Sequence, residues 1–251
     1  MKRSSRLVTR LVQLGFLGAI LLAWHLSTVT GAINPLILPT VPSVWMQFEK
    51  LIASGAYWPH LQVTLTEYLV SMCIFIPTGL TLGYLVSRSR YAVRTFDPLF
   101  SGLYAIPQII LLPVYILYFG LGPGSKIAVG ATIGFFPVVL NTIAGFASVD
   151  PLYITAAKSM GASGFKMFWS VMVPAAFPVV LTGLRIGLII SFLAILGTET
   201  IVSLSGLGHR IVTLAELLNT SLMFAYILFA IMVAIVLNFV VSSAEARGRR
   251  R

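Results

Sequence analysis

The sequence predicts an all-α protein that crosses a membrane about six times. Hydrophobic residues fill 58% of its 251 positions and charged residues only 10%, whereas a soluble domain has roughly 25% charged residues. Long apolar runs recur along the chain, and the mean hydropathy is +0.96. Basic residues gather in clusters between these runs. Together these observations indicate a polytopic membrane protein with one transmembrane domain over residues 1–251.

The net charge of +10 could suggest a protein that binds nucleic acid. The basic clusters, however, open the chain, punctuate its middle and close it, as the positive-inside rule for membrane proteins predicts. A nucleic-acid site needs aromatic and basic residues interleaved on one solvated face, and the sequence shows none. We therefore expect membrane lipid, and no nucleic acid, around this chain.

The first apolar run, residues 7–28, follows a basic flank. A cleaved signal peptide is the rival interpretation, because it shares the basic start and the apolar core. The run is about twenty residues, which is long for a signal core, and no clear A-x-A site follows it. An uncleaved first span is therefore favoured.

Residues 30–59 are less apolar and rich in proline. An amphipathic segment begins in this region, and we expect it to lie on the membrane surface outside the cytoplasm. The apolar positions at helical spacing are Val44, Phe48, Leu51 and Ile52.

Five further spans are expected, each about the length that crosses a bilayer as a helix. Pro107 and Pro113 should break the third span of the six, and the GLGPG segment after Phe119 predicts a turn. The five spans cover about residues 61–86, 96–119, 126–147, 181–204 and 217–241.

Six spans place both termini on the same side of the membrane, and the basic residues indicate which side. Of the 17 Lys and Arg residues, only Lys50, Lys126 and Arg210 fall on the opposite side, leaving 14 with the termini and with residues 150–178. This bias predicts that the termini and the 150–178 loop are cytoplasmic.

The 150–178 loop carries charges between apolar runs. Asp150-Pro151 is a helix-start signal, because Asp caps free N–H groups and Pro suits the first turn. A break near Gly161 is expected because glycine adopts the backbone angles that end a helix. The second short helix should stop at Pro174, which lacks an N–H. By composition alone, the loop could be an ordinary amphipathic connector.

The spacing of residues in this loop favours a more specific interpretation. Ala156-Ala157, then Gly161, then Val171 to Pro174 match the pattern E-A-A, three residues, G, nine residues, I-x-L-P. This pattern resembles the signature loop of permease subunits in binding-protein-dependent ABC importers. Thr155 stands where that family usually has Glu, and valines replace Ile and Leu. The missing carboxylate removes any charge contact that the family makes at this position.

The resemblance extends over most of the chain from about residue 40. Segments such as LPTVPSVW, FGLGPGSK, FPVVLNTIAG and TGLRIGL look like the nitrate/sulfonate/taurine branch of these permeases. It implies a bacterial inner-membrane homodimer with two ABC ATPase subunits inside and an extracytoplasmic substrate-binding protein outside. It further implies a coupling helix from about Leu152 to Phe165. The residues carried over onto this ATPase-coupling loop are Thr155, Ala156, Ala157, Lys158, Gly161, Ala162 and Pro174.

No catalytic constellation is visible in the sequence. The three histidines are scattered, and a single cysteine gives no metal-ligand spacing. No GK dipeptide occurs, so the phosphate-binding motif GxxxxGK[ST] is absent. We therefore expect no catalytic residue, metal or cofactor in this chain, with ATP bound and hydrolysed by a partner subunit.

Polar residues within or at the ends of spans remain candidates for function, because ionisable groups in a membrane are costly unless they are paired or hydrated. Glu199, Asn141 and Arg185 are candidates for the translocation path or for a contact with the binding protein. Pairing at a dimer interface is an equal alternative for Glu199. Arg185 is more simply explained by reaching the interface or holding the loop, and Glu67 by a structural contact.

Two other function classes remain open. An ion-gradient-driven transporter or channel would need paired ionisable groups at mid-membrane depth, whereas Glu67 and Glu199 are near span ends. A membrane scaffold without transport is the other alternative. The sequence does not identify the solute: sulfonate, taurine and nitrate follow from the branch alone, and neutral cargo stays open.

Overall fold

The structure is a computed structural model that describes the backbone of residues 2–248 and the side chains of residue 8 and residues 11–243. The basic residues at the two chain ends, on which part of the topology prediction depends, lie outside the described side chains. In the described part every element is helical. The elements are α1 (Lys2–Val29), α2 (Val41–Ser54), α3 (Trp58–Ser87), α4 (Arg90–Ala105), η1 (Gln108–Leu111), α5 (Leu112–Phe119), α6 (Pro123–Ala147), α7 (Pro151–Ser159), α8 (Gly164–Met167), η2 (Phe168–Met172), α9 (Val173–Ile201), α10 (Leu207–Glu216) and α11 (Thr220–Gly248).

Within the described residues, five helices are long and apolar enough to cross a membrane, and a bent pair raises the number to six. The bent pair is α4 with the segment from η1 to α5, which turn by 78° at their junction. Pro107 lies at this bend and is extended, as predicted. Pro113, however, lies in the first turn of α5 and does not break it, because a first-turn N–H has no partner inside a helix in any case.

The chain divides into two compact units, described separately here. The first consists of Met1–Pro59 with Arg210–Ile231. In this unit α2 begins at Thr40, whose hydroxyl accepts a hydrogen bond from the Ser43 N–H. Its apolar face buries Val44, Phe48 and Leu51, as the helical spacing predicts, while Ile52 is exposed.

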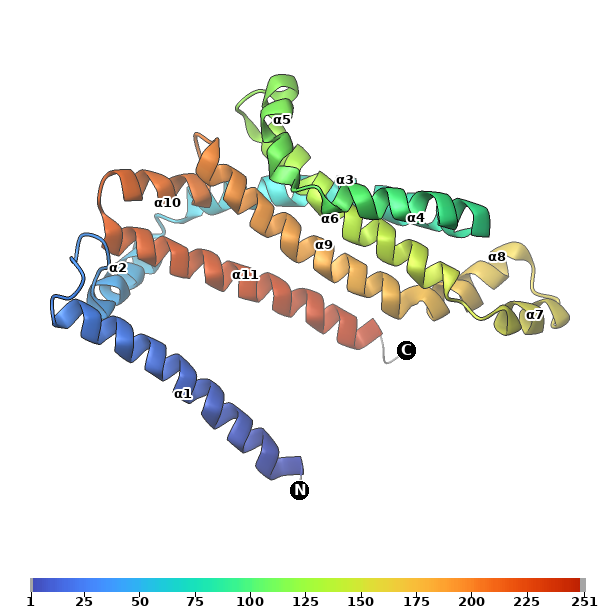
Figure 1. Cartoon of the computed structure of the whole chain (residues 1–251), viewed down its shortest axis with the longest axis horizontal. Coiled ribbons are helices and arrows are strands. Elements are labelled where there is room, and N and C mark those ends of the chain that lie inside the picture. The colour runs from blue at the N-terminus through green and yellow to red at the C-terminus, as the bar shows by residue number, and fades with distance from the viewer. Residues whose placement is uncertain (1, 249–251) are drawn as a thin grey trace. The chain divides into compact units, whose positions relative to one another are not determined.

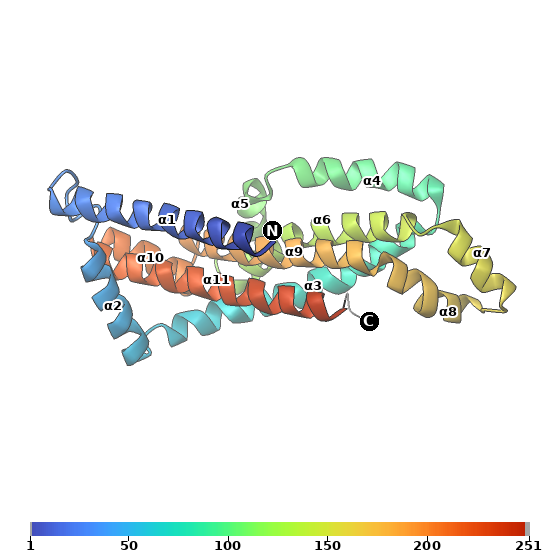
Figure 2. The same cartoon turned by 90° about the horizontal axis from the view of Figure 1, so that it is seen from below.

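The second unit, His60–His209 with Met232–Arg251, is built on α3, α6 and α9. Helices α6 and α9 lie side by side over most of their length (Figures 1 and 2). The close approach depends on pairs of glycines four residues apart, one pair on each helix, because small residues let membrane helices come near each other. The pairs are Gly79 and Gly83 on α3, Gly130 and Gly134 on α6, and Gly183 and Gly187 on α9.

These glycines face neighbouring backbones and side chains directly. A Cβ on Gly187 would lie 2.7 Å from the Gly134 carbonyl oxygen, and one on Gly79 would lie 2.8 Å from Val138. Real Cβ atoms almost never approach that closely. Phe75, Ala131 and Val138 form the buried cluster where the three helices meet. The single cysteine, Cys73, is exposed on α3.

Candidate functional site

The loop of residues 150–178 follows α6 and includes the start of α9, and its helices α7 and α8 form one end of the second unit, beyond the ends of α6 and α9 (Figures 1 and 2). Its first helix, α7, starts as the sequence predicts. Asp150 is the N-cap, and its Oδ1 accepts a hydrogen bond of 2.8 Å from the Leu152 N–H. Pro151 occupies the first turn. A capped start of this kind stabilises a short helix that has few hydrogen bonds of its own.

The same helix ends at Ser159, and Gly161, two residues later, has a φ of +75°. The Ala162 N–H donates to the Ala157 carbonyl and the Gly161 N–H to the Lys158 carbonyl, each at 2.9 Å. These two bonds form a Schellman motif, which needs a left-handed residue and therefore favours glycine. The predicted break near Gly161 is confirmed.

The second half of the loop differs from the prediction at Pro174. The helix does not stop there: α8, η2 and α9 follow one another directly from Gly164 to Ile201, and Pro174 lies in the first turn of α9. The intervening segment η2 is a π-helix, in which the Val173 N–H donates to the Phe168 carbonyl five residues back. The wider π turn separates the proline ring from the preceding turn, so the chain remains helical.

Ala157, which the resemblance carries over onto the ATPase-coupling loop, is only 2% exposed and lies inside the chain. Its side chain is therefore not on the surface that another protein could meet. Nearby, Ile154 packs against the buried cluster of Val149, Ala176 and Val180, which joins α7 to α9. The other signature positions of α7 and its C-cap are at the surface: Thr155, Ala156, Lys158 and Gly161 are exposed, and Ala162 is half-buried.

Thr155, which replaces the usual glutamate, uses its hydroxyl locally. The side chain donates a hydrogen bond of 3.0 Å to the Pro151 carbonyl one turn earlier. It therefore supplies an apolar methyl group and a satisfied hydroxyl at this position instead of a charge.

Large apolar side chains of this loop are exposed at the surface of the chain. We call Leu152, Tyr153, Met160 and Phe165 the loop patch; all are more than half exposed, and Met160 reaches 81%. Apolar side chains gathered beside exposed lysines are typical of a surface that another protein covers. The loop patch is therefore a candidate docking surface.

Aromatic contacts connect the π turn to the spans. The ring of Phe168 lies 4.7 Å from that of Tyr84 on α3, and stacks at 6.0 Å on Phe146 of α6. Tyr84 and Phe146 are themselves 5.1 Å apart. These ring contacts attach the π turn to α3 and α6, and they add to the energy of burial.

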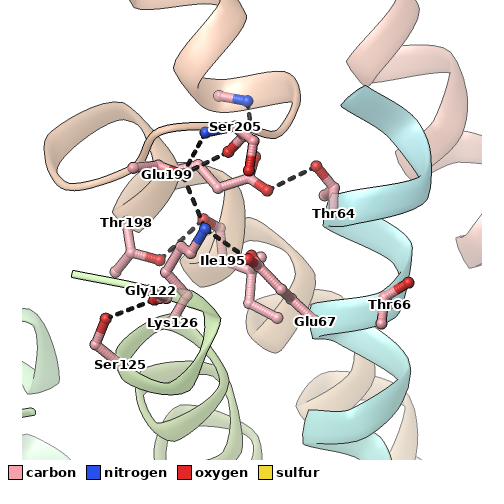
Figure 3. Close-up of polar contacts among 12 residues, drawn as sticks. Thr64, Thr66, Glu67, Gly122, Ser125, Lys126, Ile195, Thr198, Glu199 and Ser205 are labelled. Carbon is pink, nitrogen blue, oxygen red and sulfur yellow. Dashed lines mark hydrogen bonds and ion pairs between the residues drawn. The ribbon is translucent and has the colours of Figure 1, made fainter. Parts of the chain in front are cut away.

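A buried group of charged residues joins the three helices near their other ends (Figure 3). Lys126, near the start of α6, places its ammonium 2.5 Å from Glu67 of α3. It also donates a hydrogen bond of 2.8 Å to the Ser203 hydroxyl, after the end of α9. Glu67, Lys126 and Glu199, named here the ionic cluster, are each no more than 2% exposed.

Glu199 fixes the turn between α9 and α10. One carboxylate oxygen accepts a hydrogen bond of 2.7 Å from Thr64, and the other accepts one of 2.7 Å from the Gly208 N–H. The Thr64 hydroxyl in turn accepts from the Leu207 N–H at 3.0 Å. The carboxylate and Thr64 together accept hydrogen bonds from the first two N–H groups of α10, which have no partner within the helix.

The three candidates for the translocation path have different hydrogen-bond partners. Glu199 bonds within its own chain and is 1% exposed, so this conformation does not present it to a solute or a docking protein. Asn141 donates to the Pro137 carbonyl at 2.8 Å, in its own helix. Arg185 donates to Asn238 of α11 at 3.4 Å. Their predicted roles in transport or in docking stay untested.

Sequence reasoning missed the ionic cluster. Lys126 enters the sequence argument only as a charge on one side of the membrane and as part of the FGLGPGSK segment, and no contact is predicted for Lys126, Thr64 or Ser203. A signal was available: Glu67, Lys126 and Glu199 occupy the same end of three predicted spans. Because an isolated charge there is costly, their opposite signs could have predicted a contact. Within the part of the chain that the structure describes, no three His, Cys, Asp or Glu residues are placed to hold a metal ion.

Comparison with known proteins gives consistent matches. The family model for the "Binding-protein-dependent transport system inner membrane component" matches residues 76–250. The taurine transport system permease protein TauC of Escherichia coli is 30% identical over 97% of this chain and 90% of its own length. The putative aliphatic sulfonates transport permease protein SsuC of the same organism is 33% identical over 85% of this chain and 81% of its own.

A solved structure shows the same fold at lower identity. The inward-facing MetNI methionine ABC transporter contains a chain that is 19% identical, with a TM-score of 0.61, over 83% of this chain and 99% of that one.

Proposed function

Because this chain belongs to the family of binding-protein-dependent transport system inner membrane components, it is a permease subunit of an ABC importer in the inner membrane, and we propose that it imports a small sulfonate. The proposal places two copies of the chain in the transporter. Two ABC ATPase subunits bind and hydrolyse ATP on the cytoplasmic side of the membrane. Both termini of each permease copy lie on that side as well. A substrate-binding protein delivers the solute from outside.

The observation that carries the proposal is the loop patch on a rigid support. The Schellman motif fixes the angle between α7 and α8, and the buried Ala157 and partly buried Ile154 attach α7 to the fold. The exposed apolar side chains above them suit an interface with another protein. In a permease, which does not hydrolyse ATP itself, the partner that such a surface should meet is the ATPase.

The contacts described above explain how a conformational change of the ATPase moves the transmembrane helices. Movement of the loop passes through η2 into α9 and through Phe168 to Tyr84 and Phe146. At the far end, the ionic cluster ties α3, α6 and α9 together. The three helices therefore rock as one body, which is the rigid-body motion that alternating access requires.

The choice of a sulfonate rests on the relatives. Permeases that match most of this chain are named for taurine and aliphatic sulfonates. We expect uptake of taurine or an alkanesulfonate to require ATP, the ATPase and the binding protein together. Uptake by this chain driven by an ion gradient, without any ATPase, would contradict the proposal.

The first test places a charge on the loop patch. Met160→Glu should reduce both co-purification with the ATPase and ATP-dependent uptake by at least about tenfold, because a buried unpaired carboxylate costs several kcal/mol at an interface. Tyr91→Glu is the matched control, since Tyr91 is also 81% exposed but lies on α4. Equal losses in the two variants would show that the loop patch is not the docking surface.

The second test separates the shape of the loop from its surface. Gly161 has open space around its α-carbon and a positive φ. Gly161→Trp should leave the protein inserted but abolish uptake, because a bulky side chain is placed on the docking surface in a strained conformation. Gly161→Asn should retain most activity, since asparagine tolerates the left-handed region. Normal uptake by inserted Gly161→Trp would count against coupling through this loop.

A further inference from the structure

A cavity of about 230 Å³ lies in the first unit, between α2, α10 and α11. None of its lining residues belongs to the 150–178 loop or to the ionic cluster, and no step of the proposed transport cycle uses it. Its lining residues are Gln47, Lys50, Leu51, Ser54, Ala56, Arg210, Leu222 and Tyr226. The volume accommodates a small polyatomic ion together with several waters.

The charges that line this cavity are all positive. Lys50 and Arg210 contribute two cations, and none of the lining residues is acidic. The neighbouring carboxylate of Glu49 is engaged elsewhere, because it accepts a hydrogen bond of 2.6 Å from the Trp45 indole. Two cations facing one cavity without a carboxylate repel each other, and an anion between them removes that repulsion.

Arg210 packs on an aromatic ring and has a buried N–H group that can donate a further hydrogen bond. Its guanidinium carbon lies 5.9 Å from the centre of the Tyr226 ring, and Tyr226 is fixed by a hydrogen bond from its hydroxyl to the Ala56 carbonyl at 3.2 Å. The Arg210 Nε is buried and, among the described residues, has no hydrogen-bond partner. A buried N–H without an acceptor is costly, so an acceptor inside the cavity would stabilise this arrangement.

We propose that this cavity binds an oxyanion group, a sulfonate or a phosphate, between Lys50 and Arg210. The planar Arg210 guanidinium suits two oxygens of a tetrahedral group, while Lys50 supplies a flexible point charge and Gln47 and Ser54 supply neutral hydrogen-bonding groups. The group has two possible sources: a free sulfonate on the outer side of the membrane or the phosphate of an anionic lipid. The free-sulfonate source rests on the proposed function, whereas the site itself does not.

The experiment uses the full-length permease, purified without ATPase or binding protein. Binding of methanesulfonate is measured by saturation-transfer NMR in nanodiscs of phosphatidylcholine. Retention of phosphatidylglycerol is measured by native mass spectrometry after purification from mixed lipid. Lys50→Gln and Arg210→Gln should each weaken binding of one of these probes by at least about tenfold, which corresponds to one hydrogen bond to a charged group.

Lys50→Arg should bind the probe as the wild type does, because it keeps the positive charge. Arg94→Gln should not change binding, because Arg94 is an exposed cation of α4 that does not line the cavity. If only methanesulfonate binding responds, the source is a free sulfonate; if only phosphatidylglycerol retention responds, it is lipid. Both results support the site. Unchanged binding of both probes in Lys50→Gln, or an equal loss in Arg94→Gln, would overturn it.

Arg210→Gln could fail to fold because Arg210 packs on Tyr226, but Lys50 is exposed and its variants keep the test decisive. The outcome is also independent of transport. A permease that binds methanesulfonate but does not import sulfonates would refute the proposed solute and leave the site intact.

Discussion

The ionic cluster shows how single residues settle the energetics of a membrane protein interior. Two carboxylates and one ammonium are buried together, and isolated charges in such surroundings would each be expensive. The hydrogen bonds from Thr64 and the Gly208 N–H to Glu199 offset part of that cost. The pairing of Lys126 with Glu67 offsets a further part.

Removal of the one cation from this cluster should be strongly destabilising. Lys126→Met leaves two buried carboxylates without a counter-charge, and breaking a buried pair in this way costs roughly 3–5 kcal/mol. We expect Lys126→Met to have a lower midpoint temperature of inactivation in detergent than the wild type, as measured by size-exclusion chromatography of heated samples. The double variant Glu67→Gln, Lys126→Met should recover much of the loss, because one of the charges disappears with its partner.

Lys166→Met serves as the control for that experiment, since Lys166 is exposed and exposed substitutions change stability by about 0.5 kcal/mol or less. A Lys126→Met protein as stable as the wild type would show that the pair contributes nothing to the fold.

At the scale of elements, the packing of α6 against α9 depends on where glycine is required and where it is not. Gly183 faces the Pro137 carbonyl oxygen, which would lie 2.6 Å from an added Cβ, whereas Gly197 on the same helix has nothing within 4 Å. The two positions therefore test packing with the same substitution in the same helix.

Gly183→Ala should destabilise the protein by about 1–3 kcal/mol, the usual cost of overpacking a filled interface. Gly197→Ala should be neutral or stabilising by up to about 1 kcal/mol, because alanine has the higher helix propensity. Thermal inactivation of the purified variants measures both effects. Similar melting behaviour of the two variants would contradict the role of close approach at Gly183.

The π-helical segment η2 is the second feature at this scale. It contains one residue more than an α-helical turn, and it ends at Met172, two residues before Pro174. Deletion of Ser170, which is exposed, would return the segment to α-helical spacing and press the Pro174 ring against the preceding turn.

We expect the Ser170 deletion to cost about 3 kcal/mol, the usual penalty for proline inside an α-helix. Adding Pro174→Ala to the deletion should remove most of that penalty. The stabilities of both proteins, compared with Pro174→Ala alone, provide the measurement. Failure of Pro174→Ala to rescue the deletion would indicate that the π turn serves another purpose, such as placing Phe168 among its aromatic neighbours.

At the scale of the whole molecule, the predicted orientation in the membrane follows from the distribution of Lys and Arg residues. It can be tested in a Cys73→Ala background with single cysteines at exposed positions of α2 and of the 150–178 loop. In intact cells, a membrane-impermeant maleimide should label Ala53→Cys but not Ser163→Cys. Inverted membrane vesicles should give the opposite pattern. Labelling of Ser163→Cys from outside the cell would reverse the topology and remove the basis for an ATPase contact.

Features that depend on neighbours in the chain were predictable from the sequence. Apolar runs identified the membrane class and most spans, and short-range signals placed the helix start at Asp150 and the break at Gly161. The helix boundary at Pro174 was predicted wrongly because a proline permits either a helix end or the first turn of a new helix. Local residue types do not decide between these outcomes; the π turn before it does.

Hydropathy and capping depend on residues that are close in the sequence, and the charge bias depends only on the order of spans and loops. Residue order was therefore sufficient to predict a helical membrane permease with a loop broken at Gly161. The tertiary structure alone decided which charges meet, which glycines are indispensable, and that Ala157 and Glu199 are buried. Thr64 and Glu199 lie 135 residues apart in the chain, and no periodicity specifies a contact at that separation. It exists only because α3 and α9 pack in one register, which brings a hydroxyl and a carboxylate to the same depth.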